Sequence, residues 1–205
     1  DKRKDDAQPI SFPTQCPVCG SPLYREEDAA IDYCSSAVCP AQLSRGIEHY
    51  ASREAMDITG LGTAMVDRLV DLGMLKRISD IYRLDYAAIA ALPRMGDKSV
   101  KNLEQAINES KQRNLDRSLY ALGIRFVGLV TARNLAQHFG TIEAIMQADL
   151  AELSSVPEVG AKIAKVLQDY FSNPANIEEI QALQTLGVSF NYRSVQSSSK
   201  LAGHT

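Results

Sequence analysis

Apolar and polar positions follow one twelve-residue pattern that occurs four times from residue 58 onward. The four stretches align without gaps: ITGLGTAMVDRL (58–69), LPRMGDKSVKNL (92–103), IRFVGLVTARNL (124–135) and VPEVGAKIAKVL (156–167). In each, the first residue is aliphatic, the fourth apolar, the fifth glycine, the ninth small or aliphatic and the twelfth leucine. The glycines lie 34, 32 and 32 residues apart, and such regular spacing indicates a repeat architecture.

Each repeat predicts two helices joined by a tight turn. From the fifth position the apolar residues recur with a helical period, so a helix is expected to begin near the glycine. Upstream segments such as YAAIAAL and DLAELSSV are also helical in character. The aliphatic first and fourth residues are expected to fold the turn back onto the helix pair. The sequence therefore predicts a mainly α fold built from four helix-hairpin-helix motifs.

The glycine gives each predicted turn a possible chemistry. It places no side chain in front of the backbone amides that begin the second helix. Such amides, together with the positive end of the helix dipole, form an anion site that needs no lysine. Contacts of this kind with DNA phosphates, made from the minor-groove side, are independent of base sequence.

The repeats are of two kinds. Repeats two and four carry proline at the second position (Pro93, Pro157) and lysine at the seventh (Lys98, Lys162), whereas repeats one and three carry neither. Like repeats lie 64 or 66 residues apart. This predicts two duplicated pairs of hairpins, each hairpin of a pair holding one strand of a duplex, with repeats one and three serving partly as packing units.

Two simpler interpretations of the pattern compete with this one. A glycine between helices is most often only a turn or helix cap, and a leucine at helical spacing is usually a core residue. Four matches in register favour DNA binding over that interpretation. A nucleotide-binding P-loop is excluded for LPRMGDKS, because Ala91 stands where its first glycine should be and Asp97 separates Gly96 from Lys98.

The composition is that of a chain that can bury a hydrophobic core, and its charges are unevenly distributed along the sequence. The 205 residues are 45% hydrophobic and carry a net charge of −3, which argues against a strongly basic nucleic-acid binder. Residues 91–140 nevertheless hold 8 basic and 4 acidic groups. An uneven scatter of solvated charges is the alternative interpretation. No apolar run is long enough for a membrane span, and DKRKDDAQP lacks the apolar core of a signal peptide, so a cytoplasmic, reducing compartment is expected.

Four cysteines near the start have the spacing of a metal site. Cys16 and Cys19 form Cys-x2-Cys, and after 14 residues Cys34 and Cys39 form Cys-x4-Cys. Two such turns can supply four thiolates to one structural zinc ion, and the closed tetrahedron leaves no position for a catalytic water. Two disulfides or a redox pair are the alternatives, disfavoured by the expected compartment and by the missing βαβ context. His49 is expected to have a structural or surface role.

The cysteine cluster followed by LSRGIEHYASREAMDITGLG, LYALGIRFVGLVTARNLAQHFGT and VPEVGAKIA resembles bacterial NAD-dependent DNA ligase over about residues 10–190. In that family a nucleotidyltransferase domain and an OB-fold come before the zinc finger, and a BRCT domain follows the helical domain. The resemblance implies a bacterial, cytoplasmic and nucleoid-associated enzyme that encircles nicked double-stranded DNA in replication and repair. A monomer is the default expectation. It assigns the end of the OB-fold and a linker to 1–14, the zinc finger to 15–44, the tandem helix-hairpin-helix domain to 45–190, and a linker with the first BRCT residues to 191–205.

The chain departs from the whole enzyme in what it lacks. It has no Lys-x-Asp-Gly motif, so the lysine that carries AMP in such ligases is missing. The chain is therefore expected to be an internal fragment with no catalytic residues that does not bind NAD, self-adenylate or seal nicks alone. NAD and magnesium are implied only for the absent catalytic domain.

The expected DNA contacts are hairpin glycines and nearby cations. The family's hairpins contain Gly-x-Gly, whose first glycine corresponds to the third position of each repeat. Only the first repeat has glycine there, Gly60, and the other three have Arg94, Phe126 and Glu158. Arg94 could reach a phosphate, whereas Glu158 would repel one and weaken the fourth hairpin. The expected DNA-binding residues are Gly60, Gly62, Arg94, Gly96, Lys98, Arg125, Gly128, Gly160 and Lys162.

Two other functions fit parts of the pattern. A free-standing, structure-specific DNA-binding protein of recombination or excision repair also uses paired helix-hairpin-helix units. A structural spacer without DNA affinity fits the net negative charge. The cysteine cluster and its fixed junction to ITGLG favour the ligase.

Overall fold

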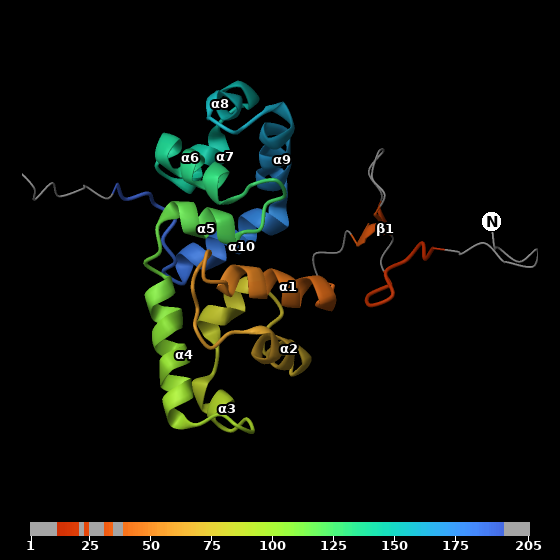
Figure 1. Ribbon diagram of the computed structural model, residues 1–205, viewed down its shortest axis with the longest axis vertical. Coiled ribbons are helices and arrows are strands. Elements are labelled where there is room, and N and C mark those ends of the chain that lie inside the picture. Colours follow the sequence, from red (N-terminus) through yellow and green to blue (C-terminus); the bar gives the residue numbers. More distant parts are fainter. Residues whose placement is uncertain (1–11, 21–22, 25–30, 35–38, 195–205) are drawn as a thin grey trace, which may run out of the picture.

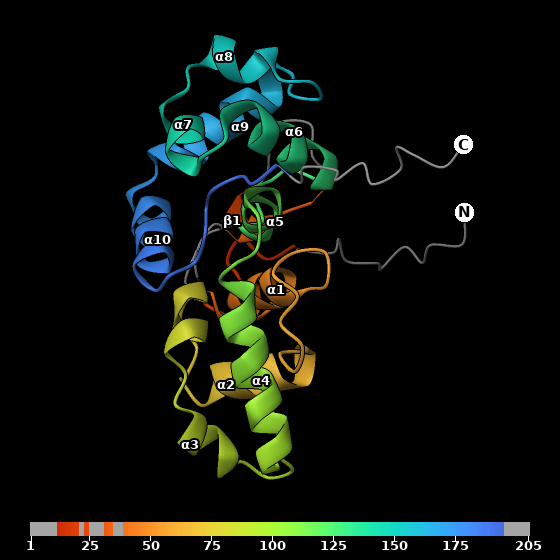
Figure 2. The same cartoon turned by 90° about the vertical axis from the view of Figure 1, so that its left-hand side faces the viewer.

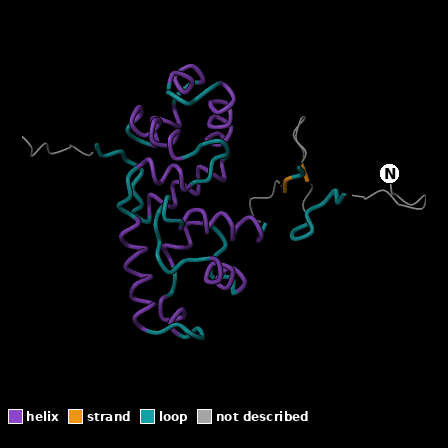
Figure 3. The backbone as a smooth tube through the Cα atoms, viewed as in Figure 1, coloured by secondary structure: helices purple, strands orange, loops and turns teal. Residues whose placement is uncertain are grey.

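The computed structural model describes residues 12–20, 23–24, 31–34 and 39–194, and these are mainly helical (Figures 1 and 3). The OB-fold end expected before residue 12 and the BRCT residues expected after 194 lie outside the described residues. None of the helices among the described residues is long and apolar enough to cross a membrane.

The cysteine-bearing segment holds the strands. β1 (Leu23–Tyr24) pairs antiparallel with β2 (Tyr33–Cys34), with Leu23 opposite Cys34. The first helix, α1 (Pro40–Ala51), begins directly after Cys39. Proline at the first helical position needs no hydrogen-bond partner there, which favours a helix start at this point.

The helices form two groups in the same order. The first comprises α1, α2 (Thr63–Asp71), the 3₁₀ helix η1 (Ile78–Arg83), α3 (Tyr86–Ala90) and α4 (Asp97–Ser110). The second comprises α5 (Leu115–Ala121), α6 (Leu129–Phe139), α7 (Ile142–Gln147), α8 (Leu150–Ser155) and α9 (Ala161–Ser172), and α10 (Pro174–Thr185) completes the chain. Figure 1 shows α2–α4 at one end of the helical body, α6–α9 at the other, and α5 and α10 between them.

Equivalent residues perform equivalent structural tasks in the two groups. Asp85 caps α3 and Asp149, 64 positions later, caps α8. Ile81 in η1 and Ile145 in α7 are both buried in the core. The duplicated arrangement thus extends beyond the hairpins to the segments that connect them, although the connecting element is a 3₁₀ helix in one group and an α-helix in the other.

The repeated apolar positions build the core. The leucines at the twelfth position, Leu69, Leu103, Leu135 and Leu167, are at most 1% exposed. The first and fourth positions are also buried, except that Leu92 and Met95 of the second repeat are only partly covered.

Helix α10 joins the two groups. Glu179 accepts hydrogen bonds from Arg77 Nε and from the Ser79 backbone amide, both at 2.6 Å. Phe190, beyond the helix, is 2% exposed, and its carbonyl accepts from the Ile142 amide. These contacts hold the end of the chain against both groups.

Candidate metal centre and nucleic-acid interface

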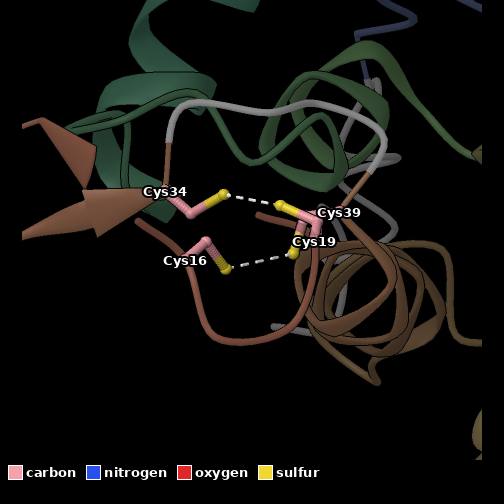
Figure 4. A group of neighbouring side chains, drawn as sticks. All are labelled: Cys16, Cys19, Cys34 and Cys39. Carbon is pink, nitrogen blue, oxygen red and sulfur yellow. Dashed lines mark hydrogen bonds between the residues drawn. The ribbon is translucent and has the colours of Figure 1, made fainter. Parts of the chain in front are cut away.

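The four cysteines come together as sequence spacing predicts. Their Sγ atoms all lie within 4.8 Å of one another, with 3.9 Å between Cys16 and Cys39 and 3.5 Å between Cys19 and Cys34 (Figure 4). A zinc ion with four Zn–S bonds of about 2.3 Å needs sulfurs about 3.8 Å apart. None of the four forms a disulfide in the structure. The donor set and its dimensions therefore suit one tetrahedrally bound metal ion.

Local backbone structure explains how these thiols meet. The Gly20 amide donates to the Cys16 carbonyl at 2.8 Å, and Gly20 has a φ of 71°, so the CPVCG turn closes with a left-handed residue. The β1–β2 pairing brings Cys34 opposite Leu23. Cys39 is the N-cap of α1, where the helix dipole favours a negatively charged thiolate.

His49 has the structural role expected for it. Its Nε2 lies 2.8 Å from the Tyr120 carbonyl oxygen, and its ring packs edge-on against the Tyr120 ring at 4.7 Å between centroids. It joins α1 to α5.

All four predicted hairpins have the same turn geometry. We define hairpins one to four as residues 58–62, 92–96, 124–128 and 156–160. In each, the amide of the fourth residue donates to the carbonyl of the first, at 3.0 to 3.2 Å. The third residue always has positive φ: Gly60 99°, Arg94 67°, Phe126 65° and Glu158 68°. This is the pattern of a type II turn, in which proline is favoured at the second position, as at Pro93 and Pro157.

The fifth-position glycines need no unusual backbone conformation. Gly62, Gly96, Gly128 and Gly160 have φ between −80° and −90° and extended ψ. A Cβ added to any of them meets nothing within 4 Å among the described residues. The left-handed residue that the turn requires is therefore the third, and the folded chain itself gives no reason for glycine at the fifth.

These glycines are N-caps of the long second helices. Among the described residues, no side chain caps α2, α4, α6 or α9. Five other helices receive side-chain caps: α3, α5, α7, α8 and α10 are capped by Asp85, Asn114, Thr141, Asp149 and Asn173. Helix α1, which begins after Cys39 of the metal cluster, receives none from the described residues. The first-turn amides of the four hairpin helices are consequently open at the surface. Figure 2 shows the loops from α1 to α2, α3 to α4 and α8 to α9 on its right-hand side.

The cations predicted from sequence lie around these helix starts. Arg94 and Lys98 are exposed in and beside hairpin two. Lys162 Nζ and Arg125 Cζ lie 4.5 Å and 4.7 Å from the centre of the Phe126 ring, which places hairpin three beside the start of α9. Glu158 is exposed in hairpin four, so an anion bound there meets a carboxylate as well as Lys162.

Sequence reasoning missed two side chains that connect neighbouring hairpins. Arg68 Nη1 donates to the Pro93 carbonyl at 2.9 Å, and Asn134 Nδ2 donates to the Pro157 carbonyl at 3.0 Å. Both donors occupy the eleventh position of their repeat. The repeat alignment could have located this position, but arginine and asparagine do not suggest a shared task by residue type.

Two further arginines bind the loop that comes directly before hairpin one. Arg113 donates to the Met56 carbonyl at 3.2 Å and pairs with Asp57 at 2.8 Å. Arg117 donates to the Ala55 carbonyl at 2.6 Å, and burial lowers the pKa of this arginine. A cavity of about 400 Å³ opens beside the hairpin, lined in part by Gly60, Gly62 and Thr63.

Comparison with known protein families agrees with this architecture. Residues 15–41 match the NAD-dependent DNA ligase C4 zinc finger domain. Residues 52–109 match the SAM-like helix-hairpin-helix tandem, and residues 117–180 match the helix-hairpin-helix motif.

Individual relatives extend the similarity over nearly the whole chain. Proteins named DNA ligase from Alkalilimnicola ehrlichii, Marinobacter nauticus and Symbiobacterium thermophilum are 45%, 48% and 47% identical to it over 191, 198 and 190 residues. The aligned regions cover 93%, 96% and 92% of this chain but 28%, 29% and 28% of those proteins. The chain thus spans less than a third of the length of the curated relatives it matches. The zinc finger match, the two helix-hairpin-helix matches and these relatives agree with the resemblance to NAD-dependent DNA ligase found in the sequence.

Proposed function

We propose that this chain is a DNA-binding portion of an NAD-dependent DNA ligase, and that it holds nicked duplex DNA by its phosphates without reading the base sequence. Four open helix starts are the contacts: the backbone amides at the fifth to seventh positions of each repeat bind phosphate oxygens. The glycines Gly62, Gly96, Gly128 and Gly160 let the DNA backbone approach, while Gly60 and Arg125 belong to the adjoining turns.

The observation that carries the proposal is the contrast between capped and uncapped helices. Five other helices receive a polar side chain at the N-terminus, whereas the four that follow the hairpins begin with glycine. An added Cβ meets nothing within 4 Å in the described part of the protein, so internal packing does not account for these glycines. Open amides at a helix N-terminus bind anions well, which accounts for both facts.

The same chemistry reconciles phosphate binding with a net charge of −3. Amides neutralise no charge, so only the cationic contacts, Arg94, Lys98, Arg125 and Lys162, displace counterions. We expect a log–log salt slope of about −3 to −5, since each neutralised phosphate contributes about −0.9. Affinity is expected to be modest, because the rest of the enzyme does not contribute.

The test is a titration of a fluorescently labelled nicked duplex at two salt concentrations, with a second duplex of unrelated sequence. Equal affinities for the two sequences support the proposal. Absence of binding even at low salt contradicts it.

A matched pair of variants tests the amide contacts. Gly96→Val places a β-branched side chain over the start of α4 at φ −90°, a backbone conformation that valine adopts readily. It is expected to weaken binding about tenfold, equivalent to one lost charge-assisted contact, with helicity unchanged. Gly46→Ala in α1, where an added Cβ also meets nothing within 4 Å, is the control and is expected to bind normally. Equal affinity of Gly96→Val and the unmodified chain removes hairpin two from the contacts.

The proposal extends to the intact protein. There we expect nick sealing with NAD and magnesium, supplied by a catalytic domain whose Lys-x-Asp-Gly motif this chain does not contain. Within the chain, 15–44 would form the zinc finger and 45–190 the DNA-gripping domain. A monomer in the bacterial cytoplasm, associated with the nucleoid, fits this function.

A further inference from the structure

Hairpin three differs from the other three in the chemistry that it exposes. Phe126, Leu129 and Val130 are 43%, 43% and 61% exposed, and they are three of the eight large exposed hydrophobic residues identified in the described part of the protein. They lie within five residues of one another, at the third, sixth and seventh positions of the repeat.

The other repeats carry no large apolar residue at these positions. The third position holds Gly60, Arg94 or Glu158; the sixth holds Thr63, Asp97 or Ala161; and the seventh holds Ala64, Lys98 or Lys162. The turn geometry is nevertheless the same in all four, with Phe126 at φ 65° beside Arg94 at 67° and Glu158 at 68°. The apolar side chains of hairpin three therefore occupy the places where the other hairpins present small, polar or charged groups.

Core packing gives no reason for these side chains to be apolar. Their exposure leaves most of the Val130 side chain and nearly half of each of the others in water. Phe126 also holds a left-handed conformation that is strained for any residue with a Cβ. An exposed apolar cluster of this kind marks an interaction surface.

The surroundings indicate what this surface contacts. Lys162 and Arg125 lie over the Phe126 ring at 4.5 Å and 4.7 Å, so the apolar group is bordered by positive charge. Leu129 and Val130 are the first two residues of α6, whose uncapped amides are the proposed phosphate contact. The apolar group covalently next to a DNA phosphate is the deoxyribose ring, and deoxyribose rings line the minor groove.

We propose that Phe126, Leu129 and Val130 pack against deoxyribose rings of the minor groove, and that hairpin three supplies an apolar, salt-independent part of DNA binding. Minor-groove proteins frequently use apolar side chains on DNA, where these insert between base steps. The cations around the hairpins, Arg94, Lys98, Arg125 and Lys162, then supply the salt-dependent part. The inference rests on the proposed function, because it assumes that DNA occupies the hairpins.

Salt dependence separates the two kinds of contact. Leu129→Ser with Val130→Ser in one chain removes apolar surface that is already exposed, so its melting temperature is expected to stay unchanged. Its affinity for nicked duplex is expected to fall about tenfold at every salt concentration, leaving the log–log slope unaltered. Lys98→Gln is the matched control: its slope is expected to become shallower by about 0.9.

A tryptophan reporter checks the same contact directly. The chain contains no tryptophan, so Phe126→Trp introduces a single fluorophore at the tip of hairpin three. Its emission is expected to shift or be quenched as duplex is added, at the same concentrations at which labelled DNA becomes bound.

The outcomes separate this inference from the proposed function. If the unmodified chain binds no DNA, both fail. If it binds while the double serine variant binds equally well, or while the emission of the Phe126→Trp variant stays constant, the sugar contact is wrong and the DNA-gripping function stands. Self-association of the unmodified chain that the double serine variant abolishes, with DNA binding unchanged, also overturns the inference by assigning the surface to a second copy.

Discussion

The Asn134 side chain donates to the Pro157 carbonyl at 3.0 Å, just as Arg68 donates to the Pro93 carbonyl at 2.9 Å. Each bond runs from the second helix of an odd-numbered repeat to the turn of the next repeat. The two hairpins of a pair are thereby fixed to each other by one hydrogen bond at the same repeat position. Under the proposed function, this equivalence gives the duplication a physical purpose, because two strands of a duplex can be held at a set spacing only if the hairpins are fixed.

Asn134→Ala is expected to loosen hairpin four from α6. One exposed hydrogen bond contributes about 0.5–1 kcal/mol, so the free energy of unfolding should change little. DNA affinity should fall about threefold, as the hairpin loses its fixed place. Titration of nicked duplex, with urea unfolding in parallel, measures both quantities.

The role of Arg68 in positioning hairpin two can be tested with a variant that keeps the positive charge. Arg68→Lys retains the positive charge but replaces the planar guanidinium that donates to Pro93. If Arg68 positions hairpin two, Arg68→Lys and Arg68→Ala should bind DNA similarly weakly. If Arg68 acts only through its charge, the lysine variant should bind as well as the unmodified chain, and the positioning role is wrong.

Glycine substitutions at the third position of hairpins two and four should affect stability alike and DNA binding oppositely. Arg94 and Glu158 have φ of 67° and 68°, so glycine relieves strain at both sites and should stabilise the fold by about 1 kcal/mol. Arg94→Gly removes a cation and should weaken binding, with a shallower salt slope. Glu158→Gly removes a repelling carboxylate and should tighten it.

Thermal melts and salt-dependent titrations measure these effects. Gly60→Ala is the reverse control: Gly60 already has φ 99°, so a side chain there should destabilise the fold. If Arg94→Gly and Glu158→Gly both bind DNA with the affinity of the unmodified chain, neither side chain comes near DNA.

Sequence predicted the parts of the molecule that depend on repeated local patterns. Helical periodicity located the second helices, because their buried ninth and twelfth positions recur in every repeat. Cysteine spacing located the metal cluster, because two short turns determine where four thiols can meet. The third-position strain at Phe126 was not predicted, since residue type alone does not reveal a positive φ. The Arg68 and Asn134 bonds were also missed, because they depend on how separate repeats pack.

Alkaline pH should expose the contribution of partly or fully buried tyrosines to stability. Burial raises the pKa of Tyr170 from 10.0 to about 12, with the nearby Glu179 carboxylate as a second cause. Above pH 10 the unfolded tyrosine loses its proton while the folded one keeps it, so unfolding releases protons and stability falls as pH rises. This loss should extend from about pH 10 to about pH 12.

Tyr170→Phe isolates that contribution. The variant keeps the ring but has no ionisable hydroxyl, so its free energy of unfolding should fall less steeply over the same pH window. Burial also raises the pKa values of Tyr50 and Tyr82, so a residual slope should remain. Identical pH profiles for the variant and the unmodified chain would contradict the assignment to Tyr170.

Metal removal should affect the cysteine segment far more than the helical body. Cys16, Cys19, Cys34 and Cys39 can bind metal only as thiolates, so acid should release the metal by protonating them. A chelator should release it by competing for the ion. The continuous core of the helical body begins at Ile47 and includes none of these cysteines. After chelation, the circular dichroism of the helices should therefore remain largely unchanged.

Amide hydrogen exchange shows where protection is lost after chelation. The loss of protection should appear in the CPVC turn, in β1–β2 and in the first turn of α1, while α2 to α10 stay protected. Elemental analysis of protein purified under reducing conditions should give about one zinc per chain, and Cys39→Ser should reduce that content. Loss of protection throughout α2 to α10 on chelation would mean that the metal supports the whole fold, and protein purified without zinc would rule out the metal centre.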